Sequence, residues 1–358
     1  MAVPRKNGFK VNKYDEELKK FLAKKKANIK VIGSGGAGNN TITRMMQVGI
    51  EGVETIAMNT DAQDLLYSDA DKKLLIGKEV TGGLGAGGDP KVGNEAAKES
   101  REEIKEMIQG ADMVFITCGL GGGTGTGSAP VIAETAKKMG ILTVGIVTLP
   151  FTMEGKVRMK NAREGLAELR KFVDTIIIIP NDRLLEIVPD VSLATAFKVA
   201  DEILVNSVKG ITELITKPGL INLDLADVKS VMTNGGLAMI GMGESDTENR
   251  GIEAVEKALS NPLLALDIEN ADGALINVTG GPDITIREAQ QVVEAVSSRL
   301  NEDAKIIWGA QINKDLAETV RVLVVVTGVK GSDEIIQEKF LKPRKTFVEE
   351  ELGIEFIE

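Results

Sequence analysis

The sequence predicts an α/β protein in which a Rossmann-like parallel sheet is joined by one long central helix to a smaller α+β domain. Two observations carry this prediction. Short, almost continuously apolar segments alternate with amphipathic segments over the first half of the chain, which is typical of parallel strands covered by helices on both faces. One amphipathic segment of about seven turns then separates this half from a second set of apolar segments.

Six strands are expected in the first domain, each a short apolar run. They cover 29–32, 53–58, 73–76, 112–117, 142–148 and 175–180. Helices are expected at 93–109 and 129–139, where apolar residues recur with the spacing of one helical face. This alternation predicts a parallel sheet in a nucleotide-binding domain that spans residues 29–191.

The central helix is predicted over residues 192–217, because its apolar residues fall three and four apart until Pro218 and Gly219 end the pattern. A smaller α+β domain is predicted over residues 218–342. Its expected strands are 237–242, 274–279, 305–310 and 321–327, and its expected helices are 247–259 and 284–300. A basic extension, 1–28, precedes the two domains and an acidic tail, 343–358, follows them.

Composition excludes several classes of function. The 358-residue chain has no histidine and one cysteine, Cys118, which excludes histidine-dependent triads, histidine metal sites and a disulfide framework. A net charge of −10 and an aromatic content of 3% argue against nucleic-acid binding. No apolar run approaches the about 18 residues of a membrane span, and no signal peptide is found. We therefore expect a cytoplasmic protein.

The charge is unevenly distributed along the chain. Residues 1–30 contain ten Lys and Arg against three acidic residues. A solvated helical extension is the simpler interpretation of this segment, and an arm that binds a membrane or a partner is the alternative.

The first of three glycine-rich segments follows the first predicted strand. Gly33, Gly35 and Gly38 satisfy G-x-G-x-x-G, a spacing that lets backbone N–H groups approach phosphate at a helix N-terminus. Asp61 lies 23 residues beyond Gly38, where a dinucleotide fold would place a ribose-binding acid. A tight packing turn between strand and helix is the alternative interpretation.

Two further glycine-rich segments follow later strands. The segment 81–90 could be a flexible surface loop. In the segment 119–128, glycines are so dense that their entropy cost, about 0.5–1 kcal/mol each relative to alanine, indicates close approach to a ligand. Loops at the carboxyl ends of parallel strands meet at one edge of the sheet. Together they predict a nucleoside triphosphate site without a P-loop, in which N–H dipoles and Mg²⁺ neutralise the phosphates.

The heptapeptide GGGTGTG at 121–127 resembles the signature of the tubulin/FtsZ family, above all its prokaryotic cell-division GTPases of archaeal type. Other segments match the family in order and spacing: 33–40, 59–61, 83–90, 150–155, 180–183 and 222–227. The resemblance covers almost the whole chain. It implies a GTP-binding domain, a central helix, a smaller domain, and head-to-tail filaments that form the division ring beneath the membrane at mid-cell.

The resemblance also implies which residues contact GTP. The residues that match the phosphate loops are Gly36, Ala37, Gly38, Asn39, Asn40, Ala86, Gly87, Gly88, Gly123, Thr124 and Gly125. Of these, Ala86, Gly87 and Gly88 match the loop near the γ-phosphate. Glu154 and Arg158 match a pair that contacts ribose and a neighbouring phosphate, although their spacing also suits an i,i+4 ion pair. No residue is assigned as a direct Mg²⁺ ligand.

Asn181, Phe197 and Asp201 match the guanine pocket of the family. The Asp201 carboxylate can accept from guanine N1–H and the 2-amino group, neither of which adenine offers, so GTP is expected over ATP. Many family members carry Asn at this position, and this chain departs from them there. Phe197 can stack on the base, but its spacing equally suits the core face of the central helix.

The resemblance implies that catalysis resides in the segment 222–227. From spacing alone, Asp224 is a helix N-cap and Asp227 a first-turn acid, whereas the family assigns Asn222, Asp224 and Asp227 a catalytic role. The segment follows a helix about 35 Å long. Its carboxylates would therefore reach the GTP of the adjacent subunit, where they would position the attacking water. We expect slow turnover, because the matched motifs contain no arginine finger.

Two alternatives remain. An NAD-dependent oxidoreductase built on 33–38 and Asp61 would need a proton donor other than histidine and a reason for two more glycine loops. A tubulin-like filament GTPase with a role outside division would share all of these motifs. The expected partners are further copies of the chain and membrane-tethering division adaptors, which the tail 343–358 could bind unless it is inert.

Overall fold

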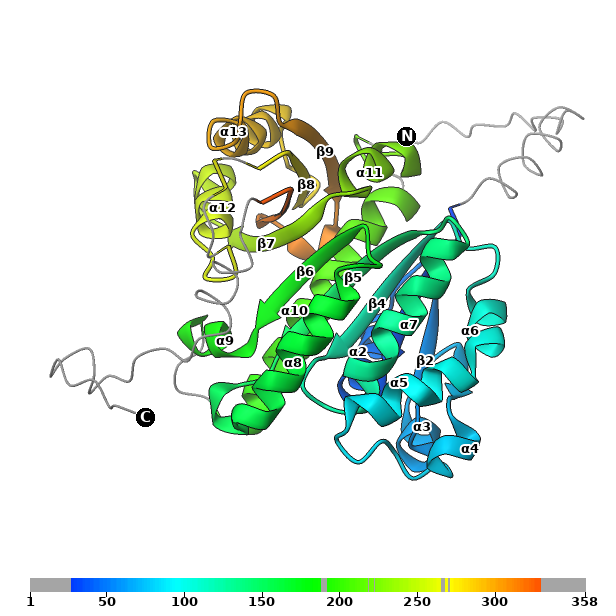
Figure 1. The fold of residues 1–358 in the computed structure, drawn as a ribbon. Coiled ribbons are helices and arrows are strands. Elements are labelled where there is room, and N and C mark those ends of the chain that lie inside the picture. The colour runs from blue at the N-terminus through cyan, green and yellow to red at the C-terminus, as the bar shows by residue number, and fades with distance from the viewer. Residues whose placement is uncertain are drawn as a thin grey trace, which may run out of the picture.

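The computed structural model describes residues 27–187, 192–217, 219–221, 223–264, 268–269 and 271–329. Within these ranges the strands form one continuous sheet in the order β3-β2-β1-β4-β5-β6-β7-β10-β8-β9. Figure 1 shows helices on both faces of this sheet. Residues 1–26 of the basic extension, the acidic tail 343–358 and Asn222 lie outside the described residues.

The first six strands confirm the predicted parallel sheet. They are β1 (Ile29–Ser34), β2 (Val53–Asn59), β3 (Lys72–Leu75), β4 (Met113–Gly119), β5 (Leu142–Leu149) and β6 (Thr175–Pro180). Each neighbouring pair runs parallel. Their side chains alternate between two separate cores, because Val31 packs on one face of the sheet and Ile32 on the other.

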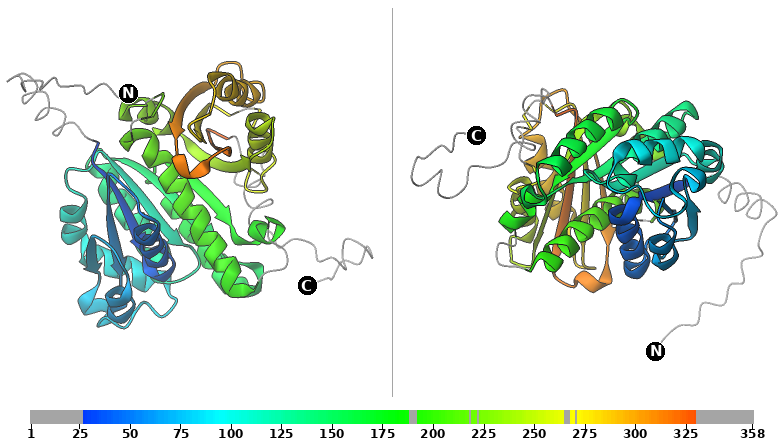
Figure 2. Two further views of the ribbon diagram at one scale, coloured as in Figure 1. Left: turned by 180° about the vertical axis from the view of Figure 1, so that it is seen from behind. Right: turned by 60° about the horizontal axis from the view of Figure 1, so that its bottom comes forward.

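Helices connect these strands and cover both faces. They are α2 (Gly35–Val48), α3 (Ala62–Tyr67), α4 (Lys78–Thr81), α5 (Pro90–Glu99), α6 (Arg101–Ile108), α7 (Thr124–Lys138), η1 (Thr152–Glu154), α8 (Lys156–Leu169) and α9 (Asn181–Ile187). The core on one face contains buried residues of α6, α7 and α8, and the core on the other contains buried residues of α2. Figure 2 shows this layering from behind and from below.

The prediction of one helix over 93–109 is wrong, because the segment divides into α5 and α6 at Ser100. Ser100 has φ −92° and ψ 21°, and its hydroxyl accepts from the Gly77 N–H at 3.0 Å. A serine hydroxyl that bonds the backbone of another segment favours a helix terminus over a helix interior. The pattern of apolar residues continues across this break, so periodicity alone could not reveal it.

The long central helix is confirmed as α10 (Leu193–Thr216). Ser192 caps its N-terminus by accepting from the Thr195 N–H at 3.2 Å. Buried residues of α10, including Ile203 and Ile211, share one core with strands of both halves of the sheet. The helix therefore packs against both halves of the sheet (Figure 2).

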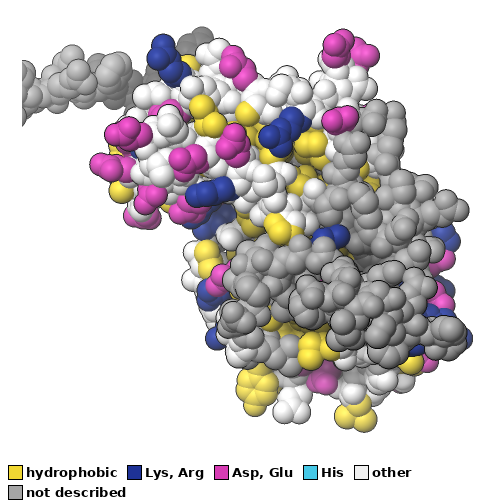
Figure 3. Space-filling model, turned by 90° about the vertical axis from the view of Figure 1, so that its left-hand side faces the viewer, with side chains coloured by type: hydrophobic (Ala, Val, Ile, Leu, Met, Phe, Trp, Pro, Cys, Tyr) yellow, Lys and Arg dark blue, Asp and Glu magenta, His cyan; other side chains and the backbone are white. Residues whose placement is uncertain are grey.

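The second half of the chain forms a mixed sheet with its own helices. Its elements are α11 (Leu225–Met232), β7 (Gly236–Ser245), α12 (Arg250–Leu259), β8 (Gly273–Gly280), α13 (Ile286–Ser297), β9 (Lys305–Ile312), η2 (Lys314–Leu316) and β10 (Val320–Thr327). Strand β10 runs antiparallel between β7 and β8, and β9 runs parallel to β8. This confirms the predicted α+β character. Figure 3 shows acidic side chains gathered on the upper part of the face that this half presents.

The two halves share a sheet, which the sequence did not reveal. Strands β6 and β7 pair in parallel over three positions, Thr175–Gly236, Ile176–Leu237 and Ile177–Ala238.

Within the described ranges, no helix combines the length and apolar character needed to cross a membrane.

Candidate functional site

Two of the three glycine loops meet at the carboxyl edge of the parallel sheet. A Cβ atom placed on Gly35 would lie 2.8 Å from the backbone N of Gly125, and one placed on Gly119 would lie 2.8 Å from the Cβ of Ala37. Gly35 also has a φ of +71°, which favours glycine. The first and third loops therefore approach each other closely, as the parallel topology predicts.

The second loop, 81–90, packs beside the third loop. A Cβ placed on Gly123 would lie 2.9 Å from the Cβ of Ala86. The Gly85 N–H donates to the Thr60 carbonyl at 3.1 Å, and the hydroxyls of Thr60 and Thr124 are 2.6 Å apart. All three loops thus lie together around the ends of β1, β2 and β4.

Two helices begin at these loops without the usual side-chain cap. The residues before α2 and α7 are Ser34 and Gly123, and neither side chain caps its helix. Neither helix has an acidic residue in its first turn. The Ser34 hydroxyl pairs with that of Ser128 at 2.5 Å. Uncapped N–H groups and the positive end of each helix dipole make this edge a site for an anion.

The predicted phosphate-loop residues differ in exposure in a way that suits a backbone-lined site. Gly38, Asn39, Ala86, Gly123 and Gly125 are buried among the packed loops. The residues that face solvent are Gly36, Ala37, Asn40, Gly87 and Gly88, with Thr124 half-buried. A Cβ on Gly87 or Gly88 would meet no atom within 4 Å. Open backbone of this kind leaves room for a polyphosphate.

The predicted base pocket lies at the start of α10. Phe197 is 41% exposed, and its ring stands edge-on to that of the buried Phe151 with centroids 5.3 Å apart. The interpretation of Phe197 as a core residue is therefore wrong. Asn181 is 5% exposed, and its Oδ1 atom has no hydrogen-bond partner among the described residues. A buried acceptor without a partner among the described residues and an open aromatic ring are both suited to receive a heteroaromatic ligand.

Asp201 stands one turn beyond Phe197 on α10. Its carboxylate accepts from the Thr41 hydroxyl at 3.2 Å. Burial raises the pKa of Asp201 to about 6, and the Thr41 hydrogen bond and the nearby Arg44 charge offset only part of that rise. A half-desolvated carboxylate with one hydrogen bond retains acceptor capacity for a ligand.

Glu154 and Arg158 form the ion pair that their spacing suggested. The Arg158 guanidinium donates to Glu154 Oε2, and Glu154 Oε1 accepts from the Phe151 N–H at 2.8 Å. The Arg158 side chain is 57% exposed and the Glu154 side chain 16% exposed. Both stand near the third loop, because a Cβ on Gly121 would lie 2.8 Å from the Arg158 carbonyl oxygen.

Asp61 does not serve as a free ribose-binding acid. It caps α3 by accepting from the N–H groups of Gln63 at 2.9 Å and Asp64 at 3.0 Å. The alternative of a dinucleotide-dependent oxidoreductase therefore loses its second motif.

Asp224 and Asp227 lie at the other end of α10 from the base pocket, on the helix labelled α11 in Figure 1. They form a reciprocal capping box: Asp224 accepts from the Asp227 N–H at 2.8 Å, and Asp227 accepts from the Asp224 N–H at 3.1 Å. Both are exposed. The local interpretation as cap and first-turn acid is thus confirmed. With 24 residues at about 1.5 Å each, α10 separates them from the base pocket by about 36 Å.

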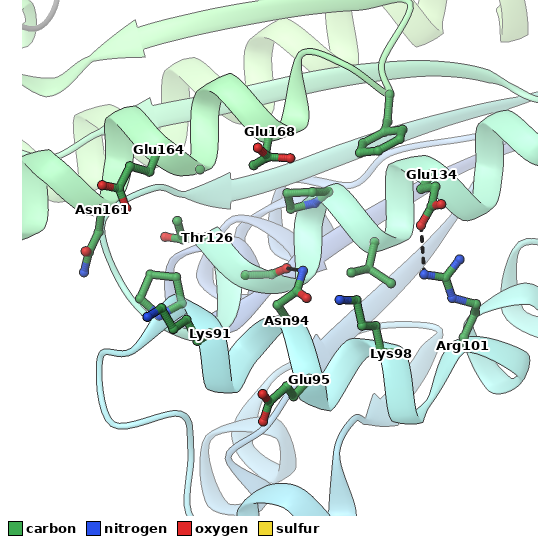
Figure 4. Close-up of a pocket in the computed structure, with 16 residues that line it drawn as sticks. Lys91, Asn94, Glu95, Lys98, Arg101, Thr126, Glu134, Asn161, Glu164 and Glu168 are labelled. Atoms are coloured by element: carbon green, nitrogen blue, oxygen red, sulfur yellow. Dashed lines mark hydrogen bonds and ion pairs between the residues drawn. The ribbon is translucent and has the colours of Figure 1, made fainter.

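Some residues of the site were given no role of their own from the sequence. Phe151, Thr41 and Thr60 take their places only through contacts between distant segments. A groove of about 630 Å³ between α5, α7 and α8, behind the second and third loops, was equally unforeseen (Figure 4). In the described part of the chain, no cluster of three acidic, cysteine or histidine residues is arranged to hold a metal ion.

Comparison with known proteins gives matches along most of the chain. Residues 28–189 match the model for the GTPase domain of the tubulin/FtsZ family, and residues 236–330 match the FtsZ family C-terminal domain. Cell division protein FtsZ 1 of Methanocaldococcus jannaschii is 63% identical over 328 residues, which are 92% of this chain and 90% of that protein. Cell division protein FtsZ of Methanothermobacter thermautotrophicus is 55% identical over 352 residues, with 96% and 92% covered.

Solved structures give the same result. An empty FtsZ dimer from M. jannaschii superposes with a TM-score of 0.85 at 60% identity, covering 97% of this chain and all of that one. A GTPγS-bound protofilament of CetZ2 from Haloferax volcanii has a TM-score of 0.75 at 23% identity, over 87% of this chain and 96% of that one. The second likeness concerns the fold alone.

Proposed function

The chain belongs to the tubulin/FtsZ family of GTPases, and we propose that it binds and hydrolyses GTP while assembling head to tail into filaments of the division ring. The observation that carries this proposal is the meeting of the uncapped N-termini of α2 and α7 among three glycine loops. Such an edge binds a polyphosphate through backbone N–H groups. The role in division follows the names of the relatives.

In the proposed complex, the three loops hold the phosphates, with Arg158 as a planar cationic donor and Glu154 as an acceptor for ribose hydroxyls. Phe197 stacks on the base, and Asn181 and Asp201 accept hydrogen bonds from the polar edge of the base. The orphaned Asn181 oxygen and the open Phe197 ring support this placement. Mg²⁺, when bound, would neutralise phosphate charge, and the hydroxyls of Thr60 and Thr124 stand among the loops where it would sit.

Hydrolysis requires a group that positions water, and no histidine exists to do so. We assign this role to Asp224 and Asp227, with Asn222 beside them in sequence. The length of α10 prevents them from reaching the nucleotide of their own chain, so the site is completed by the next subunit. Two carboxylates held away from the phosphates also avoid weakening GTP binding in the monomer.

An interface between opposite ends of identical subunits is heterologous, and one that does not close into a ring produces an open filament. Because the nucleotide lies in that interface, its hydrolysis changes the contact that holds the filament. We further propose that the filament assembles beneath the membrane at mid-cell, held by adaptors that bind the tail 343–358. Fluorescent fusions with and without this tail would show whether the tail recruits the protein to the division site.

The deciding experiment measures GTP hydrolysis per molecule against protein concentration, with ATP as the nucleotide control. We expect negligible hydrolysis below a threshold and a cooperative rise above it. A rate per molecule that is independent of concentration would mean that each chain holds a complete site, and the shared site would be wrong.

A mixing experiment tests the shared site directly. One variant, Gly36→Trp, fills the open first phosphate loop, where a Cβ would meet only Asp64 Oδ2 at 3.6 Å, and so blocks the nucleotide site. A second variant, Asp227→Ala, lacks the carboxylate. We expect each to be inactive alone, and their mixture to regain hydrolysis at junctions where an intact nucleotide site meets an intact Asp227. A mixture as inactive as its components would contradict sharing, provided that sedimentation shows both variants in one polymer.

A further inference from the structure

The groove behind the second and third loops contains two asparagines that contact those loops. Asn94 comes from α5 and Asn161 from α8, on two walls of the groove, as Figure 4 shows. Asn94 lies four residues beyond the end of the second loop, whereas Asn161 lies one turn beyond Arg158. Neither residue belongs to a motif that matched the family.

Each asparagine donates to a loop carbonyl. Asn161 Nδ2 lies 3.5 Å from the carbonyl oxygen of Gly88 in the second loop and 3.5 Å from that of Gly121 in the third. An amide nitrogen has two hydrogens, one for each carbonyl. Asn94 Nδ2 donates to the Gly127 carbonyl, in the first turns of α7, at 3.1 Å. Asn161 is therefore a bridge between two phosphate loops.

The base of the second loop is already fixed by backbone packing. A Cβ on Gly127 would lie 2.1 Å from the Pro90 carbonyl oxygen, and one on Gly93 would lie 2.3 Å from the Gly123 carbonyl oxygen. Such contacts leave no room for movement of α5 against α7. Asn94 adds one hydrogen bond to this closely packed seam.

The tip of the second loop, residues 86–88, is held differently: Ala86 is buried against Gly123, but the two glycines after it are not packed. Gly87 and Gly88 have φ of +58° and +78°, are exposed and have no atom near a Cβ position. Among the described residues, the hydrogen bond that joins this tip to another element comes from Asn161. Its contact with Gly88 stands at the long limit for a hydrogen bond, so a small approach of the tip would strengthen it.

We propose that Asn161 is a positioning residue that sets the tip 86–88 against the third loop and thereby lets the protein distinguish GTP from GDP. This inference rests on the proposed function and on the match of residues 86–88 to the family loop near the γ-phosphate. GDP ends at the β-phosphate and does not reach the tip. Loss of the bridge therefore weakens the contact that only GTP makes.

The test compares the affinities of GDP and of a non-hydrolysable GTP analogue for the full chain, below the concentration at which it assembles. Asn161→Ala removes the bridge, Asn161→Gln keeps an amide, and Lys160→Ala is the matched control. Lys160 neighbours Asn161 on α8, and its side chain is 75% exposed. Thermal unfolding of each variant establishes that it is folded.

For Asn161→Ala we expect the GTP analogue to bind about 3- to 10-fold more weakly, the effect of one or two hydrogen bonds, with GDP affinity unchanged. Asn161→Gln should recover part of the loss, and Lys160→Ala should match the parent chain. Asn94→Ala removes a hydrogen bond only within the packed contact of α5 with α7. It should therefore change the ratio of the affinities for the GTP analogue and GDP less than Asn161→Ala does.

Two results would overturn the inference. An equal loss of affinity for both nucleotides would mean that Asn161 supports the site as a whole. Unchanged affinities for both would mean that the tip does not depend on Asn161. Neither result would affect the proposed function, which fails only if the parent chain binds no guanine nucleotide.

Discussion

The two ends of α10 present functional residues in opposite conditions. At its start, the Asn181 oxygen is buried without a partner, burial raises the pKa of Asp201, and the Phe197 ring stands open to solvent. Beyond its end, Asp224 and Asp227 are exposed and each accepts from the backbone N–H of the other. The Asn181 oxygen at the start of α10 therefore lacks a partner among the described residues, whereas the two carboxylates beyond its end satisfy each other's backbone N–H groups.

The difference shows how a binding site and a contributed catalytic group differ within one chain. A binding pocket must keep unsatisfied groups for its ligand, so such groups identify the pocket within the structure of a single chain. A group that acts on a neighbouring molecule needs only to be exposed and rigidly held. A capping box supplies both, and that is why these carboxylates resemble an ordinary helix start.

The largest expected effect separates two roles of Asp227, which lies beyond the end of α10: the observed role in the capping box and the proposed role in hydrolysis. Asp227→Asn keeps an oxygen that can accept from the Asp224 N–H but loses the charge. GTP hydrolysis should fall by about 10²- to 10⁴-fold, as for loss of a group that assists proton transfer, while GTP binding and stability stay unchanged. Steady-state hydrolysis above the assembly threshold measures this. Asp303→Asn, at another exposed carboxylate, is the control, and near-parental hydrolysis by Asp227→Asn would show that the cap is its whole role.

A smaller effect is expected at the start of α10, where Asp201 would contact the base. Asp201→Ala removes the acceptor for the guanine edge, and hydrogen bonds to charged groups suggest that GTP affinity falls by about 10- to 100-fold. ATP affinity should hardly change, because adenine lacks both donors. Equilibrium binding of both nucleotides checks this, and an equal loss for the two would mean that Asp201 supports only the fold.

A pH change should act on the nucleotide site through Asp201. Because burial raises the pKa of Asp201 to about 6, the carboxylate becomes protonated as pH falls through that value. GTP affinity should then drop by up to about tenfold per pH unit. The nucleotide-free protein should respond in the opposite sense, because its raised pKa makes the folded state bind the proton more tightly than the unfolded chain. From this group, stability rises as pH falls from about 6 towards the ordinary value of 3.8.

The variant Asp201→Asn distinguishes this group from others that titrate nearby. Both pH responses should be absent from it, as measured by GTP titrations and by urea unfolding at several pH values. Persistence of the two responses in Asp201→Asn would assign them to another carboxylate.

The smallest effect concerns the cap itself. Asp224→Ala removes the acceptor for the Asp227 N–H and should lower the free energy of unfolding by about 0.5–2 kcal/mol. Asp61→Ala, at the cap of α3, should cost a similar amount. If denaturant unfolding shows no loss for Asp224→Ala but a loss for Asp61→Ala, the capping box does not stabilise α11.

Much of the fold follows from local pattern. The ten strands and α10 were predictable because each is a run of apolar residues with a clear period, and the glycine loops because few other functions need so many glycines together. The break at Ser100 was not predictable, since the hydroxyl finds its partner in Gly77, far along the chain. The same holds for the β6–β7 pairing that makes the two sheets one.

The sequence by itself determined the elements, the three glycine loops and the kind of anion they could bind, because these depend on periodicity and on backbone freedom. Only the tertiary structure decided that Phe197 is open and that Asn161 joins two loops. Those facts depend on contacts between residues distant in sequence, and a local pattern carries no information about them. The separation of Asp224 from the base pocket also required the fold, since it is set by the length and direction of α10.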